Sequence, residues 1–178
     1  MIIRKAHIDD NAGIARVHVD TWRTTYRGII PDEHLANMTY SNHKQRWTHY
    51  LTNNTGGFFT YIAEDDSGQI FGFVSGGYER NTNPIYKGEL YLIYILKEYQ
   101  GQGIGRLLTQ TLIKKLLQEG INSMMLWVFA DNYVACSFYE VLGGQRLKTK
   151  QAEFGGHMLD EVAYGWMDIR KLLQDQYA

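Results

Sequence analysis

Residues 99–108 read Tyr-Gln-Gly-Gln-Gly-Ile-Gly-Arg-Leu-Leu, a glycine-rich turn between an apolar strand pattern and an amphipathic helix pattern. Its three glycines, Gly101, Gly103 and Gly105, leave a backbone with few side chains around it. Amide N–H groups at the start of a helix can converge on an anion, and the helix dipole also favours negative charge there. The turn therefore predicts a ligand that carries phosphate.

The spacing of the glycines excludes two common phosphate motifs. A Walker A loop ends in Gly-Lys-Ser/Thr, but Gly105 is followed by Arg106. A dinucleotide fingerprint, Gly-x-Gly-x-x-Gly, lacks its last glycine whether it starts at Gly101 or at Gly103. The pattern that fits is Gln-x-x-Gly-x-Gly, which begins at Gln100.

The segments on both sides of the turn predict a strand, a crossover helix and a second strand. Residues 89–96 are apolar on both faces, so this strand should lie in the middle of a covered sheet. Apolar residues recur at helical spacing from Ile104 until Gly120 ends the helix, and residues 123–129 read as another buried strand. Such a unit implies parallel or near-parallel neighbouring strands.

The remaining segments add hairpins and helices. We expect an opening strand at residues 2–6, a helix capped by Asp9 and Asp10, and a second helix over 32–51. Strands at 58–64 and 70–78 would form a hairpin. Asp131 would cap a helix over 132–142, and two strands would follow with a turn at Gly155-Gly156. The order predicts one α/β domain over residues 1–178, with a mixed sheet covered by helices on both faces.

Composition narrows the class of protein. The formal net charge of −1 gives no strong attraction to nucleic acid or to an anionic membrane. Cys136 is the one cysteine, which excludes an internal disulfide and a cysteine-based metal site, and the histidines show no metal-ligand spacing. The N-terminal residues lack the order of a signal peptide, and the longest apolar run, residues 90–96, is too short to span a bilayer. We expect a cytoplasmic protein without a metal.

At these residues the chain resembles the GCN5-related N-acetyltransferases (GNAT), whose motif Arg/Gln-x-x-Gly-x-Gly/Ala follows the fourth strand and binds the pyrophosphate of acetyl-CoA. A later stretch, Asn132-x-x-Ala135-x-x-Phe138-Tyr139 before Leu142-Gly143-Gly144, is similar to a late motif of the family. Glu89 stands where histone-type members carry a general base. The resemblance implies a mostly antiparallel sheet of about six to seven strands, whose fourth and fifth strands splay apart around CoA.

The resemblance also implies which residues contact acetyl-CoA. Backbone amides near Ile93, Tyr94 and Ile95 would bind the thioester oxygen and the pantetheine arm. Asn132 would bind the pantetheine, although a local helix cap is an open alternative. The pyrophosphate would be held by Gln100, Gly101, Gln102, Gly103, Ile104, Gly105 and Arg106.

Two residues are candidates for proton transfer. Glu89 would deprotonate the acceptor amine, directly or through a water, unless it is a solvent-facing residue at the start of its strand. Tyr139 would protonate the departing thiolate. The pKa of a phenol, about 10, exceeds that of a thiol, about 8.5, by only about 1.5 units, so the transfer costs little. The alternative role of Tyr139 is core packing. Trp22 and Tyr26 would line the acceptor pocket or pack in the core.

We therefore expect an acetyl-CoA-dependent N-acetyltransferase that acts on a primary amine of a small molecule or peptide by direct attack. The alternative from another class is a non-catalytic sensor or regulatory module that binds acyl-CoA. Family members that acetylate peptide N-termini often carry a glutamate where this chain has Trp127, so the resemblance favours a protein N-terminus less as the acceptor. A homodimer is compatible with the sequence, although no feature requires one.

Overall fold

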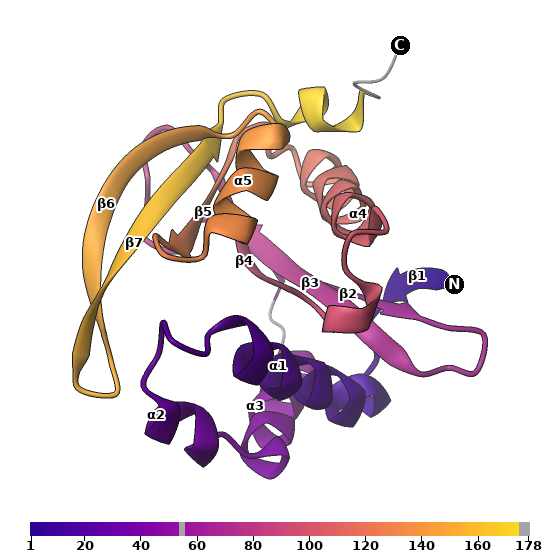
Figure 1. The fold of residues 1–178 in the computed structure, drawn as a ribbon. Coiled ribbons are helices and arrows are strands. Elements are labelled where there is room, and N and C mark those ends of the chain that lie inside the picture. The colour runs from indigo at the N-terminus through magenta and orange to yellow at the C-terminus, as the bar shows by residue number, and fades with distance from the viewer. Residues whose placement is uncertain (54–55, 175–178) are drawn as a thin grey trace.

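The computed structural model describes residues 1–53 and 56–174, and within them seven strands form one sheet in the order β1-β2-β3-β4-β5-β7-β6 (Figure 1). The strand β4 lies at its centre and, apart from the β4–β5 pair, the neighbours are antiparallel. This confirms the mixed, mostly antiparallel sheet. The strands are β1 (Ile2–Lys5), β2 (Phe58–Glu64), β3 (Ile70–Tyr78), β4 (Gly88–Ile95), β5 (Met124–Phe129), β6 (Gln145–Phe154) and β7 (His157–Trp166).

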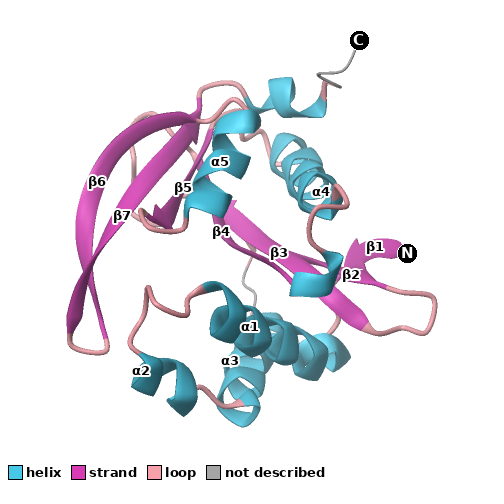
Figure 2. Ribbon diagram, viewed as in Figure 1, coloured by secondary structure: helices cyan, strands magenta, loops and turns pink. Residues whose placement is uncertain are grey.

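Helices cover both faces of the sheet, as the sequence predicts (Figure 2). On one face Trp47 of α3 packs against Phe73 of β3, with 5.0 Å between the ring centroids. On the other face α4 packs along β2, β3 and β4. The helices are α1 (Asn11–Thr25), α2 (Asp32–Asn37), α3 (Tyr40–Thr52), α4 (Ile104–Gln118) and α5 (Tyr133–Val141), with short 3-10 turns at η1 (Ile8–Asp10), η2 (Lys97–Tyr99) and η3 (Ile169–Leu173).

The pairing between β4 and β5 is short. In the described residues the two strands pair in parallel at two positions, Gly88 with Met124 and Glu89 with Met125. Beyond them β4 continues along β3, whereas β5 continues along β7. The two halves of the sheet diverge from this point (Figure 1), and the β4 backbone that faces β5 is left without a strand partner.

The expected helix over 32–51 is two helices. Met38 has an extended backbone (φ −68°, ψ 123°), which ends α2. Thr39 then starts α3, because its hydroxyl accepts a hydrogen bond from the Asn42 N–H. The sequence pattern was helical on both sides, and it did not reveal the break.

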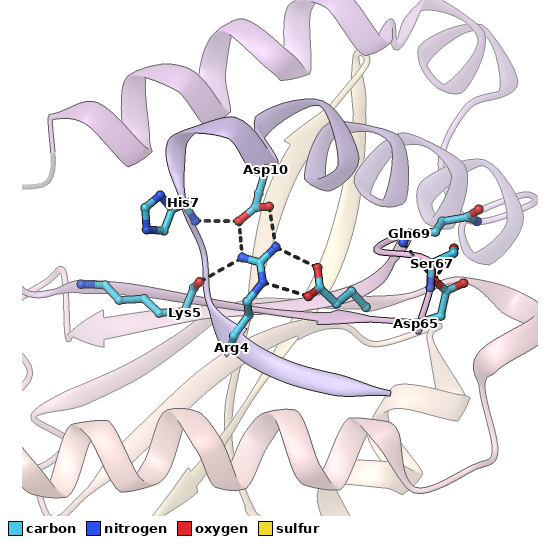
Figure 3. Close-up of polar contacts among 8 residues, drawn as sticks. Arg4, Lys5, His7, Asp10, Asp65, Ser67 and Gln69 are labelled. Atoms are coloured by element: carbon cyan, nitrogen blue, oxygen red, sulfur yellow. Dashed lines mark hydrogen bonds and ion pairs between the residues drawn. The ribbon is translucent and has the colours of Figure 1, made fainter.

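The expected cap of α1 is also wrong in detail. Asp10 stands at the N-cap position, but its carboxylate accepts hydrogen bonds from the His7 N–H (2.6 Å) and from Arg4 (2.8 and 2.9 Å). Arg4 also bonds Glu64 of β2 at 2.8 and 3.0 Å. Figure 3 shows the guanidinium of Arg4 facing Asp10. The network ties the start of α1 to the edge of the sheet.

The described part of the chain contains no helix that is both long and apolar enough to cross a bilayer.

A cluster of aromatic rings surrounds His18 on the inner side of α1. The His18 ring lies 5.0 Å from that of Tyr94 and 4.8 Å from that of His43, and the Trp47 indole N–H donates to its Nδ1 at 3.4 Å. The pKa of His18 is lowered from 6.5 to about 3, mainly by desolvation and to a lesser extent by repulsion from His43 and Arg46. His18 is therefore neutral in the folded protein at neutral pH.

Because His18 is buried and neutral, we expect the folded protein to lose stability at a pH above the range in which carboxylates titrate. Unfolded His18 takes up a proton below pH about 6.5 while folded His18 does not, so stability falls as the pH falls from there toward about 3. We expect a loss of about 1.4 kcal/mol per pH unit, measured by urea unfolding between pH about 6.5 and 4.5. His43, whose pKa is also lowered by burial, adds in the same direction. His18→Leu should reduce the dependence of the unfolding free energy on pH, and the exposed control His157→Leu should not. If both variants keep the slope of the unchanged protein, the assignment to His18 is wrong.

Candidate functional site

A cavity of about 750 Å³ lies where β4 and β5 diverge. Its walls come from β4, the glycine-rich turn, the ends of β5 and α1, the first turns of α5, and the β6–β7 hairpin. The lining includes most of the residues that the sequence singled out: Trp22, Tyr26, Ile93, Tyr94, Ile95, Gln100, Gly101, Gly103, Ile104, Gly105, Arg106, Asn132 and Tyr139.

The glycine-rich turn closes one end of this cavity. Gly101 and Gly103 have φ values of +75° and +79°, which glycine adopts without strain, and Gly103 is the N-cap of α4. The Gln100 side chain donates to the Ile95 carbonyl at 2.9 Å, which fixes the turn to the end of β4. The free N–H groups of α4 therefore lie at the cavity wall, where they and the helix dipole suit an anion.

Gly105 serves a different purpose. A Cβ atom there would lie 3.2 Å from the Phe138 ring of α5, so the glycine allows the two helices to approach closely. Gln102, in contrast, does not line the cavity. Its side chain donates to the Glu98 carbonyl at 3.1 Å.

The open edge of β4 forms a second wall. The strand pairs with β3 through Ile95, Tyr94 and Ile93, and the same three residues line the cavity. Because alternate backbone groups of a strand point to opposite edges, the groups that face β5 are available to an extended ligand.

Tyr139 and Asn132 border the cavity from the side of α5. Tyr139 is 6% exposed, and its burial, together with the neighbouring Tyr26 and Cys136, raises its pKa well above the ordinary value of 10. Asn132 is the N-cap of α5, since its Oδ1 accepts the Ala135 N–H at 3.2 Å. The expectation that Asp131 would be this cap is wrong, and the local role considered for Asn132 is present.

Glu89 lies outside this arrangement. It is 1% exposed, it is not part of the cavity wall, and both of its oxygens accept hydrogen bonds from Arg80, at 2.5 Å and 3.1 Å. Its Oε2 also accepts the Arg80 backbone N–H at 3.2 Å. Glu89 therefore does not face solvent, and its geometry argues against direct removal of a proton from a substrate in the cavity.

Aromatic rings form another part of the cavity wall. Trp22 lies 5.0 Å from Tyr26 and 6.3 Å from Phe154, and Tyr26 lies 5.3 Å from Phe129 of β5, between ring centroids. Thr21 lines the cavity and its Oγ1 is buried without a hydrogen-bond partner among the described residues, so a polar ligand group can pair with it.

Sequence reasoning did not assign three charged residues of the cavity wall to the site, namely Lys97, Asp131 and Glu161. The last of them, Glu161, lies on β7. It shares a strand face with Leu159 and Ala163, because side chains alternate along a strand. A carboxylate on an otherwise apolar face was the signal that could have identified it. Among the described residues, no group of three or more His, Cys, Asp and Glu side chains is arranged to hold a metal ion.

Comparisons with known proteins give a consistent picture. A family model described as the Acetyltransferase (GNAT) family matches residues 16–143. The protein named Uncharacterized N-acetyltransferase YuaI, from Bacillus subtilis (strain 168), is 39% identical over 170 residues, which cover 96% of this chain and 95% of that protein. A mycothiol acetyltransferase of Kocuria rhizophila is 39% identical over 94 residues, 51% of this chain and 30% of that protein.

A similar fold is found in the crystal structure of the PaiA N-acetyltransferase from Thermoplasma acidophilum in complex with coenzyme A. The TM-score is 0.71 with 25% sequence identity, and the match covers 90% of this chain and 96% of that one.

The left-handed backbone of Gly103 provides a test of the anion site. In Gly103→Ala the φ of +79° costs about 1–2 kcal/mol, which distorts the start of α4. We expect affinity for CoA, measured by calorimetry, to fall about tenfold. Gly120→Ala is the matched control, because Gly120 has φ +78°, lies past the other end of α4, and is outside the cavity wall. It should lose stability but not affinity; equal loss of CoA binding in both variants would contradict the site.

Proposed function

Since the chain belongs to the GNAT acetyltransferase family, we propose that it transfers the acetyl group of acetyl-CoA to a primary amine of a small molecule or peptide. The observation that carries the proposal is that one cavity joins the glycine-rich turn to the open edge of β4. An anion-binding helix start at one end and an unpaired strand edge beside it suit a long ligand with phosphates and an amide-containing arm.

The residues present fit acetyl-CoA. N–H groups at Gly103, Gly105 and Arg106 would hold the pyrophosphate, and the amides near Ile93 and Ile95 would pair with the pantetheine arm. Asn132 would contact the same arm from α5. Acetyl-CoA supplies an activated thioester, and a β4 amide aimed at its carbonyl oxygen would stabilise the charge that develops during attack by about 3 kcal/mol.

Direct attack by the amine is supported by the position of the one cysteine. Cys136 does not line the cavity, and its Sγ contacts the carbonyls of Phe129 and Ala130 at 3.8 and 3.9 Å. Burial raises the pKa of this thiol, which disfavours the nucleophilic thiolate. A covalent acetyl-cysteine therefore has no support in this site.

Tyr139 is the proposed proton donor to the leaving thiolate. Its raised pKa keeps the phenol protonated at neutral pH, which a donor requires. The same shift widens the pKa gap to a thiol beyond the 1.5 units expected from ordinary values, so proton transfer becomes less favourable. Tyr139 would then act chiefly by donating a hydrogen bond to the departing sulfur.

Removal of this hydroxyl should slow turnover. We expect Tyr139→Phe to lower kcat by about 10²–10³-fold, with acetyl-CoA affinity changed by less than about threefold. Tyr164→Phe is the control, because the Tyr164 hydroxyl bonds Glu140 at 2.7 Å on the same side of the sheet but outside the cavity wall. Similar kcat losses in both variants would remove the role assigned to Tyr139.

We propose that the proton lost by the acceptor amine passes to water in the cavity. Glu89 then has a structural role, as the anion of the ion pair with Arg80. Glu89→Gln should lower the free energy of unfolding by about 1–2 kcal/mol, because charged hydrogen bonds are lost. Its kcat should fall less than about tenfold, with the pH profile unchanged. Arg80→Met should destabilise more, about 3 kcal/mol, because it leaves a buried carboxylate without its cation.

A different result would restore the general-base hypothesis. If Glu89→Gln remains stable, loses more than about a hundredfold in kcat, and loses the acidic limb of its pH profile, Glu89 acts as a base through a water.

The function itself is tested by thiol release from acetyl-CoA across a panel of amines, with mass spectrometry of the acetylated product. Saturable release that depends on the amine supports transfer. Tight CoA binding without release for any amine would instead favour the non-catalytic acyl-CoA-binding module.

A further inference from the structure

Side chains of three neighbouring strands meet at the edge of the cavity. Lys150 of β6 is register-paired with Glu161 of β7, and Glu161 is register-paired with Phe129 of β5. The Lys150 ammonium lies 3.2 Å from a Glu161 carboxylate oxygen. The same Nζ lies 4.0 Å from the centroid of the Trp127 ring. The Lys150 ammonium thus contacts both a carboxylate and the face of an aromatic ring.

The three side chains differ in exposure and in their relation to the cavity. The Glu161 side chain is 16% exposed, whereas that of Lys150 is 46% exposed. Glu161 and Trp127 line the cavity, and Lys150 does not. The anion and the ring therefore belong to the cavity wall, while the lysine reaches them from beside it on a long and flexible stem.

We propose that Glu161 and Trp127 recognise a positive charge on the acceptor, an inference that rests on the proposed acetyl transfer. This charge is on a different group from the amine that receives the acetyl group. The Lys150 ammonium holds this place in the absence of the acceptor and is displaced by it. The acceptor class is then a diamine or another amine with a second cationic group.

The charge of Glu161 explains why the recognised cation is not the reacting amine. A neighbouring carboxylate favours the charged form of an amine and raises its pKa. The reacting amine must be neutral to attack, so such a partner would oppose the reaction. A second ammonium has no such requirement, and it gains from both the carboxylate and the ring face.

Displacement of Lys150 is inexpensive. A half-exposed lysine pair contributes little to stability, because its ammonium is well solvated in water once released. The aromatic rings near this position, Trp22, Tyr26, Phe129 and Phe154, suit the apolar carbons between two amines.

The test compares putrescine and cadaverine with butylamine and pentylamine, which have the same chain lengths but one amine. Binding to the CoA-loaded protein is measured by calorimetry, and acetyl transfer by thiol release. We expect at least one diamine to bind about tenfold more tightly than its monoamine partner. Glu161→Gln and Trp127→Leu should reduce that ratio, with Glu161→Gln bringing it to about one.

Lysine variants separate displacement from simple attraction. Lys150→Met should strengthen diamine binding about threefold or more, since the internal competitor is gone, and Lys150→Arg should not. Lys148→Met is the matched control, because Lys148 lies on the same strand and is 5.6 Å from the Trp127 ring. It should change the diamine affinity less than Lys150→Met does, because Lys148 is farther from the ring and is not paired with Glu161.

Two results would overturn the inference: equal binding of both diamines and their monoamine partners, or a ratio that Glu161→Gln leaves unchanged. If monoamines are acetylated as efficiently as diamines, this proposal is wrong, but the proposed acetyltransferase function is supported. Diamine-selective binding without thiol release would keep the cation site and end the proposed function.

Discussion

The early end of strand pairing between β4 and β5 is the constraint on which the rest of the site depends. After Gly88 and Glu89, the backbone of β4 loses its neighbour on one side. Unpaired backbone groups are costly when buried, so the gap requires solvent or a ligand. The cavity, the exposed strand edge and the access to the glycine-rich turn all follow from this separation.

Two contacts hold the gap at its observed shape. On the side of the turn, Phe138 of α5 packs against the position where Gly105 has no side chain, which sets the distance between α4 and α5. On the other side, Tyr26 packs on Phe129 and joins the end of α1 to β5 across the opening. The aromatic wall is therefore part of the core as well as of the cavity lining, and a role for Tyr26 in binding the acceptor stays a prediction.

Local patterns predicted most of the fold, because the relevant signals lie close together in the chain. The strands at 58–64 and 70–78 have the expected bounds, and the crossover unit was identified from its apolar periodicity and the glycine turn. Apart from the break between α2 and α3, the errors arose where a polar side chain had a choice of partners. Asp10 bonds Arg4 from another element instead of capping α1 by itself, and Asn132 caps α5 in place of Asp131.

The sequence by itself determined the family, the glycine-rich turn and the helix that carries Tyr139, since each depends on the spacing of residues along one segment. Tertiary structure alone decided the surroundings of the two carboxylates. Glu89 is held by Arg80 after the β3–β4 hairpin is formed, and Glu161 reaches the cavity through the β5–β7–β6 register. The partners of a charged side chain come from other segments of the chain, and so no local pattern specifies that Glu89 lies away from the cavity while Glu161 lines it.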